Sequence, residues 1–233
     1  MSEKLIIFYN QFIEKEGYKL VMEGLGITIL LTICAFIVGV IIGTLAAIII
    51  TKKEKSLPHK ILVIFIKSYV GFFRGTPIVV QLLFIYFVIL PLIGLGGFSA
   101  LFVAGIIFSL NSGAYVSEII RSGILSVDIG QSEAARALGL NEKQSMKWIV
   151  MPQAFKNALP ALCNEFIALL KETSIANYIA VNDLTYAFKS IGSASYEFMI
   201  PYFALALCYL FLVLVASFFV KKIERKMRES DKY

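Results

Sequence analysis

The feature that most constrains this chain is a run from Gly24 to Thr51 that contains no charged residue. A helix rises about 1.5 Å per residue, so such a run can cross the hydrocarbon core of a bilayer, which is about 30 Å thick. A second charge-free run, from Gly75 to Ser117, is too long for one crossing and has to turn back once. With 58% hydrophobic and 16% charged residues, the chain does not have the composition of a soluble domain. We therefore expect an all-α membrane protein that forms a single domain over residues 1–233.

The apolar stretches predict about five membrane spans. The turn inside the long run is marked by Pro91 and Gly94, because proline lacks a backbone donor and glycine tolerates dihedral angles that break helices. Within the first span, Gly39 and Gly43 form a small-xxx-small pair, which predicts close helix packing. The expected spans cover approximately residues 24–51, 61–90, 98–119, 158–181 and 198–220.

The basic residues gather beside the apolar runs. They concentrate in the connector 51–60, in the segment 121–156 and in the tail after Val220. The positive-inside rule places these segments in the cytoplasm, so the N-terminus is expected outside and the C-terminus inside. Because this topology accounts for the net charge of +6, we expect no nucleic acid partner.

No constellation of residues in the sequence supports enzymatic or metal chemistry. Cys34, Cys163 and Cys208 lie far apart in apolar segments and form no CxxC pair, which favours packing roles. His59 is the single histidine and has no second ligand beside it. The sequence also lacks a GxxxxGK[ST] phosphate-binding loop. We expect no catalytic residue, metal or cofactor in this chain, so the energy for its work has to come from elsewhere.

The polar segment 121–156 is predicted to form a cytoplasmic loop with a bent shape. The stretch Glu133–Leu138 consists of good helix formers, and Gly139 can adopt the left-handed conformation that ends a helix. Asn141 with Gln144 resembles a capping box that opens a second helix. A solvated loop is the alternative, but the alanines and leucines of this segment favour docking into a groove of a soluble partner.

The same segment resembles a family signature. It reads Glu133-Ala134-Ala135, three residues, Gly139, nine residues, and then Ile149-Val150-Met151-Pro152. This resembles the EAA motif of bacterial ABC importer permeases, and only Met151 departs from it, where the family has leucine. The resemblance implies coupling to a separate ATPase through Glu133, Ala134, Ala135, Arg136, Gly139, Ile149 and Pro152.

Three further strings resemble the polar amino-acid ABC importer permeases of the histidine, glutamine, arginine and cystine type. The implied fold is that of a type I ABC importer permease in the bacterial cell membrane. The implied partners are an ABC ATPase dimer that binds ATP and magnesium, a second permease copy or paralogue, and an extracytoplasmic amino-acid-binding protein. The strings are Phe73-Arg74-Gly75-Thr76-Pro77 with Gln81, Ser112-Gly113-Ala114-Tyr115 with Glu118 and Arg121, and Lys171-Glu172-Thr173-Ser174.

Polar and ionisable side chains inside the spans mark a candidate substrate path, because such groups are costly at bilayer depth unless they are paired or wetted. Helical spacing places one group of them on a shared face of the third span and another on the fourth. A zwitterionic amino acid needs substitutes for the hydration of both its charges, and these groups supply them. The predicted path comprises Thr76, Gln81, Asn111, Tyr115, Glu118, Glu165, Lys171, Glu172, Thr173 and Ser174.

Two structural alternatives stay open at this point. An ion pair of Lys171 with Glu165 or Glu118 would explain the buried charges without a substrate, and a kink alone would explain the break at Gly75–Pro77.

The expected function is that of a permease subunit, not itself an enzyme, which translocates polar amino acids at the expense of a partner's ATP. The alternative is an ion-gradient-driven secondary amino-acid transporter, whose uptake would survive ATP depletion.

Overall fold

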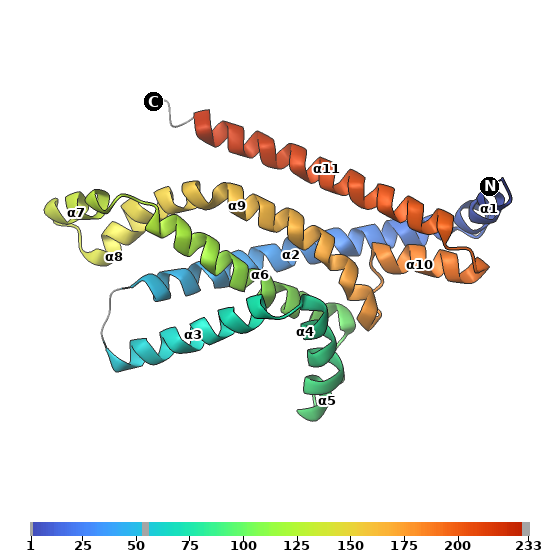
Figure 1. Cartoon of the computed structure of the whole chain (residues 1–233), viewed down its shortest axis with the longest axis horizontal. Coiled ribbons are helices and arrows are strands. Elements are labelled where there is room, and N and C mark those ends of the chain that lie inside the picture. The colour runs from blue at the N-terminus through green and yellow to red at the C-terminus, as the bar shows by residue number, and fades with distance from the viewer. Residues whose placement is uncertain (1, 53–55, 230–233) are drawn as a thin grey trace. The chain divides into compact units, whose positions relative to one another are not determined.

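The described part of the chain is helical and contains no strand, which confirms the predicted all-α class. The computed structural model describes residues 2–52 and 56–229. The predicted connector after the first span falls partly on residues 53–55, which lie outside this described part. Figure 1 shows the order of the helices along the chain.

The longest helices are α2 (Gly17–Thr51), α6 (Ala100–Leu125), α9 (Met151–Glu172) and α11 (Met199–Glu229). The shorter α-helices are α1 (Ser2–Tyr9), α3 (Leu57–Gly75), α4 (Ile78–Phe84), α5 (Leu90–Leu92), α7 (Ile129–Ala137), α8 (Glu142–Ser145) and α10 (Leu184–Ser195). Three π-helical turns, η1 (Asn10–Glu14), η2 (Ile85–Ile89) and η3 (Met146–Val150), and one 3₁₀ helix, η4 (Thr173–Ile179), complete the described elements.

Three described helices are long and apolar enough to cross a membrane: α2, α6 and α11, the last over Met199–Met227. A fourth candidate arises if the broken pair of α3 with α4–α5 counts as one span. The predicted number of about five is therefore not reached. The missing one is α9, whose apolar residues are interrupted by Lys156, Glu165, Lys171 and Glu172.

Several helix ends differ from the limits of the predicted spans, which stay predictions. The expected span 61–90 is broken, because α3 ends at Gly75 and Thr76 is extended, with φ −127° and ψ 149°. The span expected over 158–181 leaves the α-helix at Glu172 and continues as η4. The expected cytoplasmic loop 121–156 includes the last residues of α6, which runs on to Leu125, and the first residues of α9, which begins at Met151.

Two helices lie where the sequence predicted none. The expected connector Asn182–Tyr196 contains α10, which begins after the capping residue Asp183. The chain also begins with α1, ahead of the first predicted span. Neither helix is among the candidate spans, so both add structure outside the predicted membrane helices.

Contacts divide the chain into two compact units. Unit 1 comprises Met1–Ala35, Ile78–Phe108 and Ile167–Phe219, and unit 2 comprises Phe36–Pro77, Ser109–Phe166 and Val220–Tyr233. The single-domain organisation stays a prediction.

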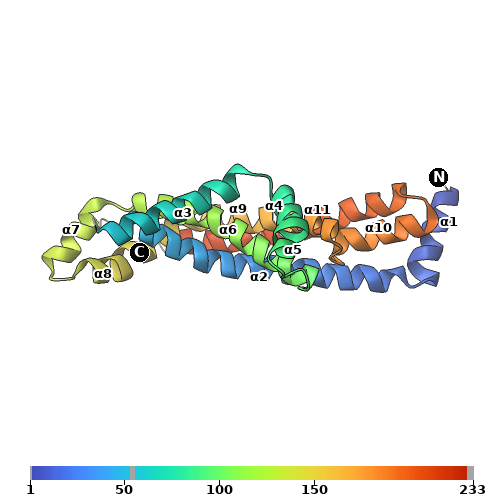
Figure 2. The ribbon, with the colours of Figure 1, turned by 90° about the horizontal axis from the view of Figure 1, so that it is seen from below.

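The core of unit 1 forms around α10. Its buried residues are Val21, Leu184, Ala187, Phe188 and Ile191. Helix α1 lies beside α10 (Figures 1 and 2). Phe8 of α1 and Phe12 of η1 are partly buried against this cluster. An ion pair of 2.9 Å joins Lys4 of α1 to Glu197, and Lys4 thereby lowers the pKa of the Glu197 carboxyl.

Unit 2 packs the second half of α2 against α6, α3 and α9. One cluster joins α2 and α6 to the helices after the bent loop, and the other joins α2, α3 and α6. The first consists of Ala47, Val116, Ile120, Ile124, Val150, Ala154, Ala158 and Leu162, and the second of Ala46, Ile66, Val70, Phe73 and Ala114.

The contact between α2 and α6 is close enough to require small residues. A Cβ atom at Gly39 would lie 2.9 Å from the Cβ of Ser112, and one at Gly43 would lie 2.7 Å from the carbonyl oxygen of Gly113. Both distances are too short for real side chains, so the glycines allow the two backbones to approach. The packing role predicted for the Gly39 and Gly43 pair is confirmed.

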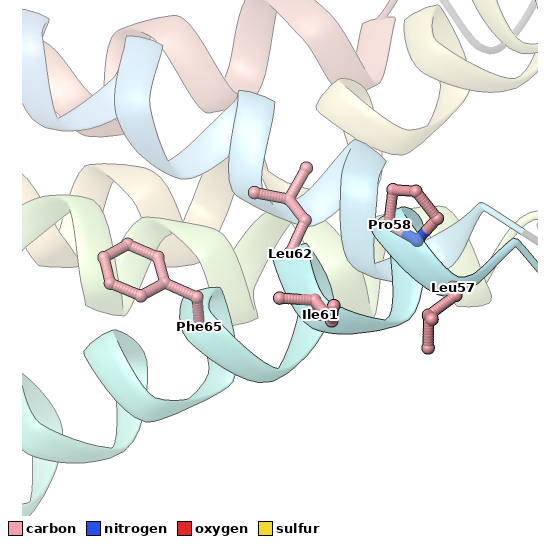
Figure 3. A pocket seen from close by; sticks show the side chains of 5 residues that line it. All are labelled: Leu57, Pro58, Ile61, Leu62 and Phe65. Carbon is pink, nitrogen blue, oxygen red and sulfur yellow. The ribbon is translucent and has the colours of Figure 1, made fainter.

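Helix α3 also presents an apolar outer face. Leu57, Pro58, Ile61, Leu62 and Phe65 line a shallow groove of about 500 Å³ (Figure 3). Exposed aliphatic and aromatic side chains of this kind match a lipid environment, in which apolar side chains have no reason to be buried.

Replacing Gly43 with alanine is expected to destabilise the chain, because the new methyl group would meet the backbone of α6. Gly26 of the same helix is the matched control, since nothing lies within 4 Å of a Cβ atom there. In thermal unfolding of the detergent-purified protein, Gly43→Ala should cost about 1–3 kcal/mol, the range for overpacked sites. Gly26→Ala should be neutral or slightly stabilising. Equal melting temperatures for the two variants would contradict the close packing.

Candidate functional site

The predicted bend in the polar loop is present. Helix α7 ends in a glycine motif: Gly139 has φ +88°, its N–H donates to the carbonyl of Arg136 at 2.9 Å, and the N–H of Leu140 donates to the carbonyl of Ala135 at 3.1 Å. These bonds satisfy carbonyls that the end of the helix leaves without partners. The positive φ is one that residues with a Cβ atom adopt at a cost, which explains the glycine.

Helix α8 begins with the predicted capping box. The Asn141 side chain accepts a hydrogen bond from the Gln144 backbone at 3.0 Å, and the Gln144 side chain accepts one from the Asn141 backbone at 2.9 Å. At the other end of the loop, Asp128 caps α7 by accepting from the N–H of Gly130 at 2.6 Å. The helix, bend and helix are thus specified by local hydrogen bonds, and Figure 1 shows α7 and α8 meeting at this corner.

The corner exposes large apolar side chains although it lies outside the candidate spans. Ile129 is 74% exposed, Leu138 is 85% exposed and Trp148 is 63% exposed. Lys147 lies 4.6 Å from the centre of the Trp148 ring and covers one of its faces. Apolar surface in water is a mark of protein–protein contact. We call the segment from Asp128 to Pro152 the docking corner.

The predicted coupling residues are distributed over the docking corner. Ala135 is buried, with 3% exposure, whereas Glu133, Ala134 and Arg136 of the same helix are exposed. Ile149 is half-buried in η3, and Pro152 is exposed in the first turn of α9. The exposed members are available to a partner.

The docking corner is anchored in the core of unit 2. Val150 and Ala154 pack in the same cluster as Ile124 at the end of α6. Gln153 donates to the Gln131 side chain at 3.3 Å, which ties α9 to α7. The corner is therefore in packed contact with both α6 and α9.

The break at Thr76 and Pro77 uses two of the predicted path residues. Pro77 has no N–H, so the carbonyl of Phe73 lacks the donor that a continuous helix would supply. Asn111 of α6 donates to that carbonyl at 3.3 Å, and the Thr76 hydroxyl donates to the carbonyl of Phe72 at 2.9 Å. Both side chains therefore donate hydrogen bonds to backbone carbonyls at the end of α3 in this structure.

A polar cleft of about 380 Å³ lies in unit 2 around two other path residues, Tyr115 and Glu118. Arg74 lies 5.5 Å from the centre of the Tyr115 ring, in a cation–π arrangement. Asn157 of α9 donates to the hydroxyl of Ser126 at 2.8 Å on the same lining. The cleft has the size of a small-molecule site and contains both signs of charge.

Glu118 pairs with a residue that the sequence did not assign to it. Arg121 donates to one oxygen of Glu118 twice, from Nε at 3.0 Å and from Nη2 at 2.6 Å. The ion-pair partner of Glu118 in the structure is thus Arg121, its neighbour one turn along α6, whereas the sequence suggested Lys171 as one alternative. Arg74 then supplies the further positive charge of the cleft lining.

The predicted path residues of the fourth span lie within α9 or directly after it. Glu165 is partly buried within α9, Glu172 is partly buried at its last position, and Lys171 is exposed. The Thr173 hydroxyl donates to the carbonyl of Leu170 at 2.7 Å, and the Ser174 hydroxyl donates to that of Lys171 at 2.8 Å. Gln81 is buried in α4. A role in substrate passage stays a prediction for these residues.

Sequence reasoning did not select some of the residues that line the cleft. Arg74 was part of a recognised string but was not chosen, although it is the last charge before the long charge-free run. Nothing in the sequence marks Ser122, Ser126 and Asn157 as site residues, because polar residues are expected near any loop that water surrounds. Their proximity to Glu118 comes only from the way α9 packs on α6.

The sequence of this helical chain, including its docking corner, matches a described protein family. The family of the binding-protein-dependent transport system inner membrane component matches residues 39–229. The arginine transport system permease protein ArtQ of Bacillus subtilis is 39% identical, over 91% of this chain and 94% of ArtQ. A Rickettsia felis protein whose name proposes a glutamine transport system permease, GlnP, is 41% identical, over 97% of this chain and 99% of that protein.

Solved structures agree with this match. The crystal structure of an amino acid ABC transporter with histidines superposes with a TM-score of 0.81 at 39% identity, covering 91% of this chain and 96% of that one. The inward-facing MetNI methionine ABC transporter shares the fold, with a TM-score of 0.75 at 18% identity, over 89% of this chain and 96% of that chain. This chain belongs to the family of binding-protein-dependent transport system inner membrane components, the permeases of ABC importers.

Replacing Asn111 with alanine is expected to destabilise the chain, because the buried carbonyl of Phe73 would lose a donor at the helix break. Loss of a buried hydrogen bond costs about 0.5–1.5 kcal/mol. Asn157→Ala is the matched control, since its bond is exposed and its loss should cost no more than about 0.5 kcal/mol. Thermal unfolding of the purified protein without substrate measures both. A melting temperature unchanged by Asn111→Ala would favour a role in substrate passage only.

Proposed function

We propose that this chain is the membrane-spanning subunit of an ATP-driven importer for polar amino acids, to which an extracytoplasmic binding protein delivers the substrate. The observation that carries the proposal is the docking corner, which exposes Ile129, Leu138 and Trp148 beyond the candidate spans while its base is packed in the core of unit 2. Such a surface fits a soluble partner that pushes on the helices. The chain itself is not an enzyme, and ATP and magnesium are bound by the partner.

Polar amino acids are the proposed substrates because the names of ArtQ and GlnP refer to arginine and glutamine transport. The cleft in unit 2 supports this class. The Arg74 guanidinium is suited to a carboxylate, and the hydroxyl and amide groups of Ser122, Ser126 and Asn157 offer hydrogen bonds. Every free amino acid carries a carboxylate, so this end of the ligand is recognised in the same way for all substrates.

The complete transporter is proposed to contain an ABC ATPase dimer, a second permease copy or paralogue, and the binding protein. Its proposed location is the bacterial cell membrane, with the N-terminus outside and the basic tail inside. The docking corner then faces the cytoplasm, where ATP is available. ATP binding and hydrolysis in the partner would move α6 and α9, because the corner is continuous with both.

Uptake of radiolabelled L-arginine and L-glutamine tests the proposal in cells that express the chain with its ATPase and binding protein. We expect uptake that stops when ATP is depleted while the ion gradients are held. Uptake that continues under this condition would contradict the proposal and support an ion-gradient-driven secondary transporter.

The variant Gly139→Asp tests the docking corner within the same assay. An L residue at φ +88° is strained by roughly 1–2 kcal/mol, so the bend is expected to shift and uptake to fall by roughly tenfold. Gly94→Asp is the matched control, because Gly94 also has a positive φ, +75°, and open space around it, but lies in the turn after α5. Co-purification with the ATPase and uptake should survive Gly94→Asp. If both variants transport normally, the corner has no coupling role.

A further inference from the structure

A cluster of hydroxyl groups lies in the otherwise apolar interior of unit 1. The Tyr209 hydroxyl of α11 lies 3.2 Å from the hydroxyl of Thr185 on α10. The side chains of Thr173 on η4 and Thr28 on α2 lie beside the same hydroxyl. Thr28 and Thr173 are fully buried. We call Thr28, Thr173, Thr185 and Tyr209 the hydroxyl cluster, and it joins four elements of unit 1.

The start of α10 binds the same cluster through its backbone. The N–H of Leu184 donates to the Thr28 hydroxyl at 3.1 Å, which connects α10 to α2. The two backbones approach closely here, since a Cβ atom at Gly24 would lie 2.6 Å from the carbonyl oxygen of Asp183. The chain between Thr173 and Leu184 is thus held against α2 at its far end.

Asp183 adds a buried carboxyl group to this junction. It is fully buried, and one of its oxygens accepts from the N–H of Tyr186 at 2.8 Å, which caps α10. Its other oxygen has no hydrogen-bond partner within the described residues. Burial raises the pKa of the Asp183 carboxyl to about 6. Burying a carboxyl group with one oxygen unpaired costs free energy, which the close packing of this junction has to offset.

The hydroxyl cluster adjoins the end of α9. Thr173 directly succeeds Lys171 and Glu172, the last two residues of α9, and its hydroxyl donates to the carbonyl of Leu170 at 2.7 Å. Thr173 therefore lies between the Tyr209 hydroxyl and the last turn of α9. A change at Tyr209 thus has a short route to the Lys171–Ser174 segment.

We propose that Tyr209 is a positioning residue which, through Thr173 and Thr185, holds the Lys171–Ser174 segment in the orientation required for the passage of an amino acid. The inference rests on the proposed function for its transport consequence, but not for its structural one. Tyr209 itself does not contact the substrate. Its hydroxyl group, not its ring, carries the effect.

Cysteine reactivity measures the structural consequence without transport. A chain with Ser174→Cys, and with Cys34, Cys163 and Cys208 replaced by alanine, is purified in detergent and treated with a maleimide. Tyr209→Phe should speed the reaction at position 174 about fivefold, the change expected when one hydrogen bond no longer opposes local opening. Tyr202→Phe is the matched control, because Tyr202 is an exposed tyrosine of the same helix. Equal rates in the two variants would overturn the proposal.

Uptake of labelled L-arginine and L-glutamine measures the functional consequence. Tyr209→Phe and Thr185→Val should lower the maximal rate severalfold with little change in KM, whereas Thr185→Ser, which keeps the hydroxyl group, should restore it. A general loss of stability would not distinguish serine from valine in this way. Identical rates for Thr185→Ser and Thr185→Val would contradict the inference.

The two failures are separable. If the unmodified transporter takes up neither amino acid but position 174 still responds to Tyr209→Phe, the proposed function fails and the positioning role stands. If uptake is normal and position 174 does not respond, the positioning role fails and the proposed function stands.

Discussion

The rest of this structure depends on one constraint: inside a bilayer, the backbone has to satisfy its own hydrogen bonds. Continuous helices such as α2 and α11 satisfy this constraint with their own backbone hydrogen bonds. Where a helix stops at membrane depth, side chains have to complete the bonding. Asn111 does so for the carbonyl of Phe73 at the break before Pro77.

This constraint changes how polar residues in the apolar helices are interpreted. The polarity of Asn111, Thr76, Thr173 and Ser174 first indicated a substrate path, yet each of them bonds to a backbone carbonyl in the structure. These residues can still line a substrate path if the helix ends that they stabilise form part of that path. Broken helices are where membrane transporters bind polar ligands, so the two roles are compatible.

The sequence predicted best what is determined locally. The bend at Gly139 and the capping box of Asn141 are specified by neighbouring residues, and both were predicted. Helix α10 was missed because a short connector between two spans was expected there. Asp183 nevertheless precedes an apolar series at helical spacing, Leu184, Ala187, Phe188 and Ile191. The cleft lining and the hydroxyl cluster could not be predicted, since Arg74, Asn157 and Tyr209 meet their partners only through tertiary packing.

The central claim is that the docking corner binds an ATPase, and cross-linking tests it most directly. A photo-reactive amino acid is placed at Leu138, which is 85% exposed, or at Leu95, an exposed control in the turn after α5, in membranes that contain the assembled transporter. The account predicts that position 138 alone forms a cross-link to a protein whose sequence contains a GxxxxGK[ST] phosphate-binding loop. Labelling of position 138 by a membrane-impermeant reagent from outside the cell, with no such cross-link, would contradict it.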